Sequence, residues 1–362
     1  MYDRHGRRFL DGLSALCCVN IGHGRADVAQ AGADQAKELG VFSNWGYAHP
    51  KPIALAARVA ELAPGTLDRV FSTSGGSEAV DSALKLCRQY HKLTGNAGRY
   101  KVISRKLAYH GTTMGALTAT GIPDARRPFE PLFPGSAHVA NINPLGPEVD
   151  DPAEAIRERI EFEGPATVSC VILEPVQNSG GCFGPPDGYF QRVREICYEF
   201  GILYISDEVI CSWGRLGEYF GAGRFGYEPD IITTAKDLTS EYAPMGAVIA
   251  SDKFFEPFAA GPDPSCTGSP SAGTRSRPRR RSPTSTSSSA SRCWKESART
   301  RRPSARCSTR CATSRSSATC AAWGTSGRSS WCAIAPRSRR SPKRSAAGCC
   351  ATSSRARSSS VG

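Results

Sequence analysis

Three chemically useful motifs follow apolar runs in this 362-residue sequence. Lys236 follows one run, Asp207 follows another, and the small-residue turn at 74–78 (SGGSE) follows a third. A lysine at the end of a buried strand can lose part of its hydration, which frees the amine to form an imine. Because α/β proteins bind ligands outside the carboxyl ends of their strands, we expect the three motifs to share one site.

The turn at 74–78 has the composition of an anion-binding turn. Gly75 and Gly76 would let backbone N–H groups approach a ligand, and Ser77 can add a hydroxyl. The dipole of a following helix favours negative charge at the same point. We expect Ser77 to be the N-cap of that helix. Taken alone, such a turn is more often an ordinary turn and cap.

Asp207 and Lys236 narrow the chemistry further. A carboxylate at a buried strand end is ionised only beside a positive partner, and the protonated ring nitrogen of pyridoxal phosphate is such a partner. An acid there is by itself more often a cap, and a lone lysine more often extends to the surface. Together, the turn, Asp207 and Lys236 match the phosphate, the ring and the aldehyde of this cofactor.

The elements that must position these side chains alternate between apolar strands and amphipathic helices. Strands are expected at residues 69–73, 101–104, 168–173, 203–205 and 231–234. A helix is expected at 186–200, closed by Gly201. Continuous apolar strands that alternate with helices indicate an α/β sheet covered on both faces.

The order of several short motifs resembles the class III, or omega-type, aminotransferases of fold type I, over residues 1 to about 263. The motifs are Asp11-Gly12-Leu13-Ser14, Asn20-Ile21-Gly22-His23-Gly24, Tyr47-Ala48-His49-Pro50-Lys51, Leu62-Ala63-Pro64-Gly65, Ser74-Gly75-Gly76-Ser77-Glu78-Ala79, Tyr109-His110-Gly111, Glu174-Pro175-Val176-Gln177, Asp207-Glu208-Val209-Ile210, Gly214-Arg215 and Thr234-Ala235-Lys236. The resemblance implies the α/β large domain of fold type I, a mostly parallel sheet with helices on both faces.

The resemblance also implies the reaction and the residues that carry it. Lys236 would form the imine with pyridoxal 5'-phosphate and later move a proton, while Asp207 would pair with the ring nitrogen. Tyr109 would stack on one face of the ring and Val209 would pack on the other. The chain would be a transaminase that moves an amino group from an amine or amino acid to a keto acid such as pyruvate. The family is homodimeric.

Four further residues complete the implied site. Gly76 and Ser77 would bind the phosphate. Glu174 would act from behind the cofactor, although a structural acid before proline is an equally good interpretation. The role of His110 also has two equally good interpretations: a functional histidine, or a core histidine with satisfied hydrogen bonds.

The resemblance divides the chain into three parts. Residues 1–40 correspond to an N-terminal segment that is truncated at its start, and residues 41–264 to the cofactor-binding large domain. Residues 265–362 stand where the family has its small C-terminal domain. The family normally has glycine after the imine lysine, whereas this chain has Asp237, with Glu241 following in the same loop. We expect Asp237 to favour the charged ammonium form of Lys236 and to crowd a tight turn.

The segment 265–362 differs in kind from the rest of the chain. It holds 21 of the 46 basic residues and one acid, Glu296, and it contains no Leu, Phe, Tyr or Met. The net charge of +13 is therefore a property of this segment. A segment so poor in apolar residues cannot offset its chain entropy by burial, so we expect disorder.

Two interpretations of this basic tail stay open. Codons compatible with residues 265–275, read one nucleotide earlier, permit a Leu-His-Gly stretch and then Gly-Gly-His-Pro, which indicates a frameshift near residue 264. The coding DNA across residues 255–285 decides this. The other interpretation is a natural tail that binds nucleic acid non-specifically or an acidic surface. The chain would then be an inactive remnant or a basic-tailed binding protein.

The remaining composition favours a soluble cytoplasmic protein. Seven cysteines precede residue 265 without metal-ligand spacing, which suits a reducing compartment better than a disulfide framework. No apolar stretch approaches the roughly 18 residues of a membrane span, and no charged and apolar leader opens the chain. We therefore expect no membrane partner and no metal.

Overall fold

The computed structural model describes residues 1–44, 47–146 and 148–260. The predictions for residues 265–362, including disorder and the frameshift, lie outside this range. None of the described helices is both long enough and apolar enough to cross a membrane.

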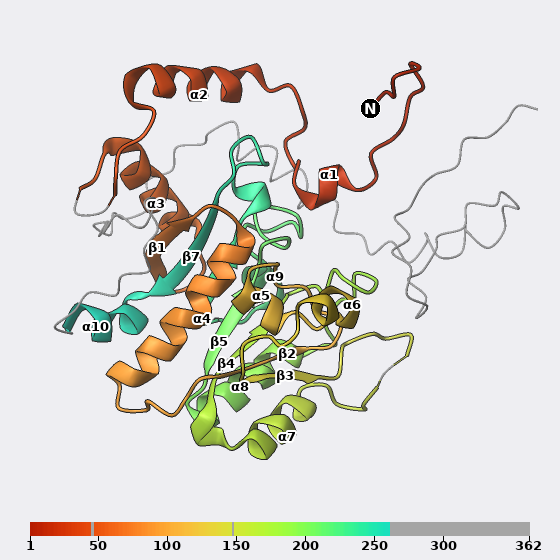
Figure 1. Ribbon diagram of the computed structural model, residues 1–362, viewed down its shortest axis with the longest axis vertical. Coiled ribbons are helices and arrows are strands. Elements are labelled where there is room, and N and C mark those ends of the chain that lie inside the picture. The colour runs from red at the N-terminus through yellow and green to blue at the C-terminus, as the bar shows by residue number, and fades with distance from the viewer. Residues whose placement is uncertain (45–46, 147, 261–362) are drawn as a thin grey trace, which may run out of the picture. The chain divides into compact units, whose positions relative to one another are not determined.

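A seven-stranded sheet forms the centre of the described residues (Figure 1). Its order is β1-β7-β6-β5-β4-β2-β3. All neighbouring strands are parallel except β7, which runs antiparallel to both β1 and β6. The strands are β1 (Leu67–Thr73), β2 (Lys101–Arg105), β3 (Ser136–Val139), β4 (Val168–Leu173), β5 (Leu203–Asp207), β6 (Ile231–Thr234) and β7 (Gly246–Ser251).

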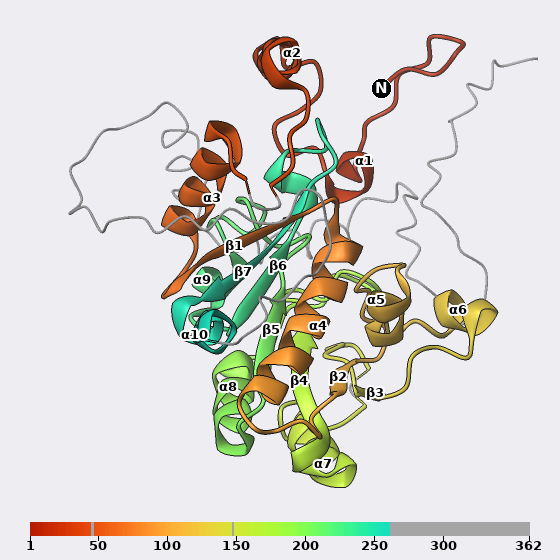
Figure 2. The same cartoon turned by 60° about the vertical axis from the view of Figure 1, so that its left-hand side comes forward.

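Helices cover both faces of this sheet (Figures 1 and 2). One apolar core lies between the strands and α4, α5 and α10, and a second lies between the strands and α3, α7, α8 and α9. The α-helices are α1 (Ser14–Cys17), α2 (Ala26–Leu39), α3 (Pro50–Leu62), α4 (Gly76–Leu93), α5 (Met114–Ala119), α6 (Pro123–Arg126), α7 (Glu154–Glu163), α8 (Tyr189–Phe200), α9 (Gly221–Phe225) and α10 (Asp252–Ala260). Three short 3-10 helices are η1 (Arg127–Phe129), η2 (Pro165–Thr167) and η3 (Lys236–Leu238). The predicted α/β sheet with two covered faces is confirmed.

The alternating direction of the side chains along each strand explains why an apolar core forms on both faces of the sheet. Side chains of successive residues point to opposite faces of a strand. On β4, Cys170 and Ile172 belong to the core beneath α4, while Val171 and Leu173 belong to the core beneath α8. Because both faces are covered, all six residues of β4 are buried, which accounts for the continuous apolar run in the sequence.

The start of α4 differs from the expectation. The helix begins at Gly76 with Gly75 as its N-cap, so the prediction of Ser77 as N-cap is wrong. Ser77 lies within the first turn, and its Oγ accepts a hydrogen bond from the backbone N–H of Thr112, at 2.9 Å. The side chain of Glu78 reaches back to the backbone N–H and the hydroxyl of Ser74. The predicted helix at 186–200 begins three residues later, as α8, and ends at Gly201, whose φ is +62°.

Candidate active site

The eight residues singled out in the sequence lie at or just beyond strand ends that share one edge of the sheet. Asp207 ends β5 and Val209 follows it, Lys236 follows β6, and Glu174 follows β4. The remaining four are Gly76 and Ser77 after β1, and Tyr109 and His110 after β2. Since these five strands all run in the same direction, their carboxyl ends meet at that edge.

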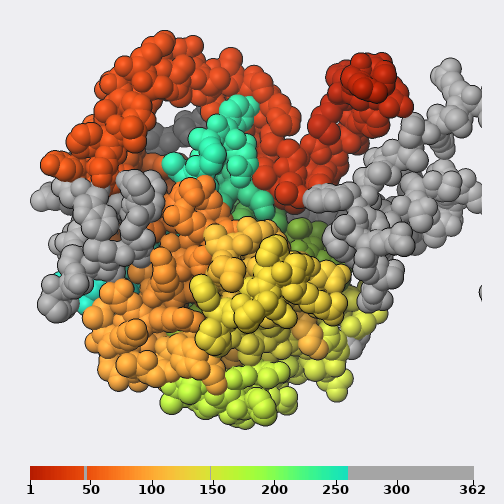
Figure 3. Space-filling view, in the orientation of Figure 1, coloured from red at the N-terminus to blue at the C-terminus, as the bar shows by residue number. Residues whose placement is uncertain are grey.

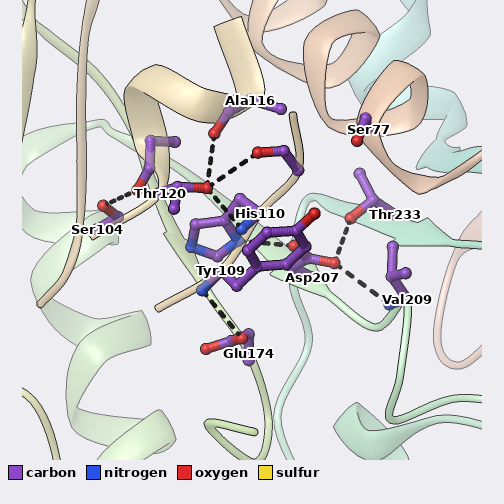
Figure 4. Close-up of polar contacts among 12 residues, drawn as sticks. Ser77, Ser104, Tyr109, His110, Ala116, Thr120, Glu174, Asp207, Val209 and Thr233 are labelled. Carbon is purple, nitrogen blue, oxygen red and sulfur yellow. Dashed lines mark hydrogen bonds and ion pairs between the residues drawn. The ribbon is translucent and has the colours of Figure 1, made fainter. Parts of the chain in front are cut away.

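Asp207 is held by three donors. Its Oδ2 lies 2.6 Å from Nδ1 of His110, and its Oδ1 accepts hydrogen bonds from the backbone N–H of Val209 (3.2 Å) and from Oγ1 of Thr233 (3.1 Å) (Figure 4). The side chains of Asp207 and His110 are 3% and 0% exposed. A buried carboxylate must be hydrogen-bonded, and this one is.

His110 therefore lies in direct contact with the carboxylate at the centre of the site. Its backbone N–H donates to Oγ1 of Thr120, at 3.0 Å, which fixes the position of the residue. Its other ring nitrogen, Nε2, is buried and has no hydrogen-bond partner among the residues that the structure describes. Among the described residues, the ring of His110 is thus hydrogen-bonded through Nδ1 and unpartnered at Nε2.

Tyr109 and Glu174 lie beside this pair. The ring of Tyr109 lies in front of Asp207 in Figure 4 and is partly exposed. Burial, together with the nearby charge of Asp207, raises the pKa of the Tyr109 hydroxyl. The backbone N–H of Tyr109 donates to Oε1 of Glu174, at 3.4 Å. Glu174 is itself buried, and burial raises its pKa to about 7.

Arg105 is a buried cation that the sequence analysis did not single out. It ends β2, and its side chain is fully buried. Its Nη2 donates to the carbonyl oxygen of Glu174 at 2.6 Å and lies 3.8 Å from Oε2 of the same residue. The signal that could have revealed it is the one used for Asp207, namely a charged residue at the end of an apolar strand.

The turn at the start of α4 is tightly packed against the end of β5. A Cβ atom on Gly76 would lie 2.8 Å from Cγ1 of Val209, so only glycine fits there. A Cβ atom on Gly75 would meet no heavy atom within 4 Å. There is therefore room beside Gly75 at the start of α4, the end of a helix that favours anions.

Lys236 lies in a strained turn directly after β6. Its φ is +44°, in the left-handed region, and the residue is half-buried. Within the described ranges, no hydrogen bond or ion pair engages its Nζ. The carboxylate of the next residue, Asp237, lies 2.9 Å from Nη2 of Arg215. Arg215, from the Gly214-Arg215 motif, is therefore a second functional candidate, for which the sequence alone indicates no role.

Comparison with known proteins places these residues in a family. Residues 1–274 match the class III aminotransferase family. The chain is 55% identical to a probable aminotransferase, Rv3329, of Mycobacterium tuberculosis, over 71% of this chain and 57% of that protein. It is 37% identical to a putrescine–pyruvate aminotransferase of Pseudomonas aeruginosa, over 71% of this chain and 58% of that one.

A solved structure agrees with the sequence relatives. The chain resembles an amine transaminase from an uncultivated Pseudomonas species in its pyridoxal-phosphate-bound form, with 36% identity and a TM-score of 0.69, over 72% of this chain and 62% of that one. The chain spans about three fifths of the length of the relatives that it matches. With the family matched over residues 1–274, the chain belongs to the class III aminotransferases, which are pyridoxal-phosphate-dependent.

Proposed function

We propose that the chain is a pyridoxal-phosphate-dependent transaminase, which moves an amino group from an amine or amino-acid donor to a keto acid such as pyruvate. One observation carries the proposal. Asp207 pairs in the sheet with Thr233, and Lys236 lies three residues beyond Thr233 with no partner for its amine among the described residues. A carboxylate held at the end of β5 suits the ring nitrogen of an aromatic aldehyde such as pyridoxal phosphate. A free amine just beyond the end of β6 suits its aldehyde group.

The residues present fit the cofactor. Asp207 would accept a hydrogen bond from the protonated ring nitrogen, and Lys236 would hold the aldehyde carbon covalently. Tyr109 and Val209 would cover the two faces of the ring, and the open space at Gly75 leaves room for the phosphate beside Gly76 and Ser77. Bound there, the cofactor would supply an electron sink for the bond that breaks at the substrate carbon.

The chain's own residues would then handle the proton. Nζ of Lys236 would be the group that takes the proton from the substrate carbon and later gives it back. His110 would hold Asp207 in place during this transfer through its 2.6 Å contact. Glu174 would fix the backbone of Tyr109 through their hydrogen bond and so keep the aromatic ring over the cofactor.

The wider properties of the chain are proposed with the activity. We assign residues 1–40 to an N-terminal segment and residues 41–264 to the cofactor-binding domain, and we propose a homodimer in the cytoplasm. The seven cysteines of the described residues are all free, which supports a reducing compartment. The basic composition of residues 265–362 supports non-specific contact with nucleic acid.

The test uses the purified full chain and added pyridoxal phosphate. We expect a near-visible absorbance band, trapping of the cofactor on Lys236 by borohydride, and amine turnover that depends on pyruvate. Lys236→Ala should lose all three, whereas Lys253→Ala, in exposed α10, should keep them. An unchanged band in the Lys236→Ala variant rules out the assignment of Lys236. Trapping without turnover, or no bound cofactor, favours the alternative of an inactive remnant or a basic-tailed binding protein.

A further inference from the structure

Arg215 joins three separate segments next to Lys236. It lies in the loop after β5, and its Nε and Nη2 lie 3.2 and 2.9 Å from Oδ2 of Asp237. Its Nη2 also donates to Oδ1 of Asn20, at 2.8 Å, and to the carbonyl oxygen of Cys17, at 3.0 Å. One guanidinium therefore connects the loop that carries Lys236 to the N-terminal segment of the chain.

The contact between these segments extends beyond Arg215. Tyr242 lies in the loop between η3 and β7; its hydroxyl donates to the carbonyl oxygen of Gly22 and accepts from the backbone N–H of Arg25, both at 2.9 Å. Ile21 donates to Oγ of Ser240, at 3.4 Å. Figure 3 shows the turquoise segment after β6 lying next to the red N-terminal segment. Residues 17–25, here called the docking strip, thus lie along the loop that carries Lys236, here called the lysine loop.

The buried carboxylate of Asp237 requires a counter-charge, and Arg215 supplies it. Its side chain is 1% exposed, whereas that of Arg215 is 23% exposed. The charged or titratable groups that face it are Arg215 from the loop after β5, Lys236 from its own loop, and the Cys18 thiol from the docking strip. Burial raises the pKa of Asp237 to about 6, so the carboxylate is ionised at neutral pH.

The charge of Asp237 matters because of its neighbour. A carboxylate without a counter-charge beside an amine favours the ammonium form, which has no lone pair to attack an aldehyde. A guanidinium cannot be deprotonated in a protein, so Arg215 supplies a permanent compensating charge. Its forked donors also fix the position of the carboxylate, and the other bonds of the same group hold the docking strip.

We infer that Arg215 is a positioning residue for Lys236: it neutralises Asp237 and ties the lysine loop to the docking strip. This inference rests on the proposed role of Lys236 in holding the cofactor. It concerns a pair peculiar to a chain with an acid directly after the lysine. The two functions of Arg215, charge and attachment, can be separated by experiment.

The charge is tested on the full chain without cofactor. The protein is treated briefly with acetic anhydride across a pH series, and acetylation of Lys236 is measured by peptide mass spectrometry, with exposed Lys253 as the internal reference. Arg215→Gln should raise the midpoint pH of Lys236 acetylation by about one unit or more. In the double variant that also carries Asp237→Asn, the midpoint pH of Lys236 acetylation should return to that of the protein without substitutions. An unchanged midpoint in Arg215→Gln, or no return in the double variant, overturns the inference.

The attachment is tested with Arg215→Lys. This variant keeps the positive charge but loses the forked donors, so we expect a midpoint near that of the unmodified protein and faster proteolysis within residues 17–25. If Arg215→Gln does not fold, Arg215→Lys still tests the inference. A raised midpoint in Arg215→Lys, or no gain in proteolysis, contradicts the inference. Because acetylation needs no cofactor, failure here is distinct from failure of borohydride trapping at Lys236, which would overturn the proposed function.

Discussion

Nδ1 of His110 lies 2.6 Å from Oδ2 of Asp207, and both side chains are buried. His110 lies in the connection after β2 and Asp207 ends β5, 97 positions further along the sequence. The contact orients the Asp207 carboxylate, while the Val209 backbone and the Thr233 hydroxyl hold its other oxygen. His110 therefore fixes the acid without facing the open side of the site.

Replacing His110 should affect both stability and cofactor. In His110→Gln, Asp207 loses a hydrogen bond to a buried charge, which should lower the free energy of unfolding by about 1–3 kcal/mol. The absorbance of bound pyridoxal phosphate should shift as well, because Asp207 moves. The matched control is His91→Gln, a buried histidine on α4 that contacts the carbonyl oxygen of Ser169. It should lower Tm but leave the absorbance unchanged, and equal spectra for both variants would contradict this role of His110.

Two adjacent glycines should respond differently to a methyl group. Gly76→Ala places Cβ 2.8 Å from Cγ1 of Val209, and such overpacking costs about 1–3 kcal/mol. Gly75→Ala meets nothing within 4 Å and has an extended backbone, so its Tm should be close to that of the unmodified protein. Thermal unfolding of the two variants without cofactor checks this. Equal Tm values would show that the contact with Val209 is not tight.

Glu241 adopts a conformation that suits glycine. Its φ is +57°, which costs a residue with a side chain about 1–2 kcal/mol. Glu241→Gly should therefore raise Tm, by roughly 2–4 °C per kcal/mol. The same change at exposed Glu256, in the middle of α10, should lower Tm, because glycine in a helix costs up to about 1 kcal/mol. Two Tm shifts of the same sign would refute this explanation.

Glu208 should make stability depend on pH. It is fully buried, and burial raises its pKa to about 7, although the backbone N–H groups of Gly221 and Ala222 and the Ser206 hydroxyl donate to it. Because this pKa lies above the ordinary value of 4.5, the folded protein binds the proton more tightly than the unfolded chain. The resulting stability is complete below about pH 4.5 and is lost as the pH rises through about 7.

Glu208→Gln removes this titration. The fall in Tm between about pH 5 and about pH 8 should be smaller in the variant than in the unmodified protein. Glu256→Gln, at an exposed position, should leave the slope unchanged. Glu174 and Asp237 have pKa values raised in the same direction and would account for the slope that remains. Identical slopes for Glu208→Gln and the unmodified protein would exclude Glu208 as a source.

The sheet was predictable from the sequence because of where its strands lie. Central parallel strands are buried on both faces, so β4 and β6 appear as continuous apolar runs. Two strands were not predicted: β7 (Gly246–Ser251), although it is buried, and the edge strand β3 (Ser136–Val139). Strand β3 is four residues long, contains His138 and alternates between buried and partly exposed residues, and therefore has no such run.

The positions of the candidate residues at strand ends were predictable from the sequence, but the contacts between them were not. Lys236, Asp207 and the turn at Gly76 follow strands, and this position is visible in a sequence. Which side chains meet depends on the order of the strands, which the sequence does not state. The contacts of Asp207 with His110 and of Asp237 with Arg215 required the sheet order and the loops to be known.

The position of β7 has a consequence for how the protein is made. β7 (Gly246–Ser251) lies between β1 and β6, and β1 has no other partner strand in the described sheet. A nascent chain on the ribosome that ends before Gly246 therefore holds β1, and the glycine turn after it, without the strand that joins them to β6. The amine of Lys236 and the turn at Gly76 are brought into one sheet only after β7 has been synthesised.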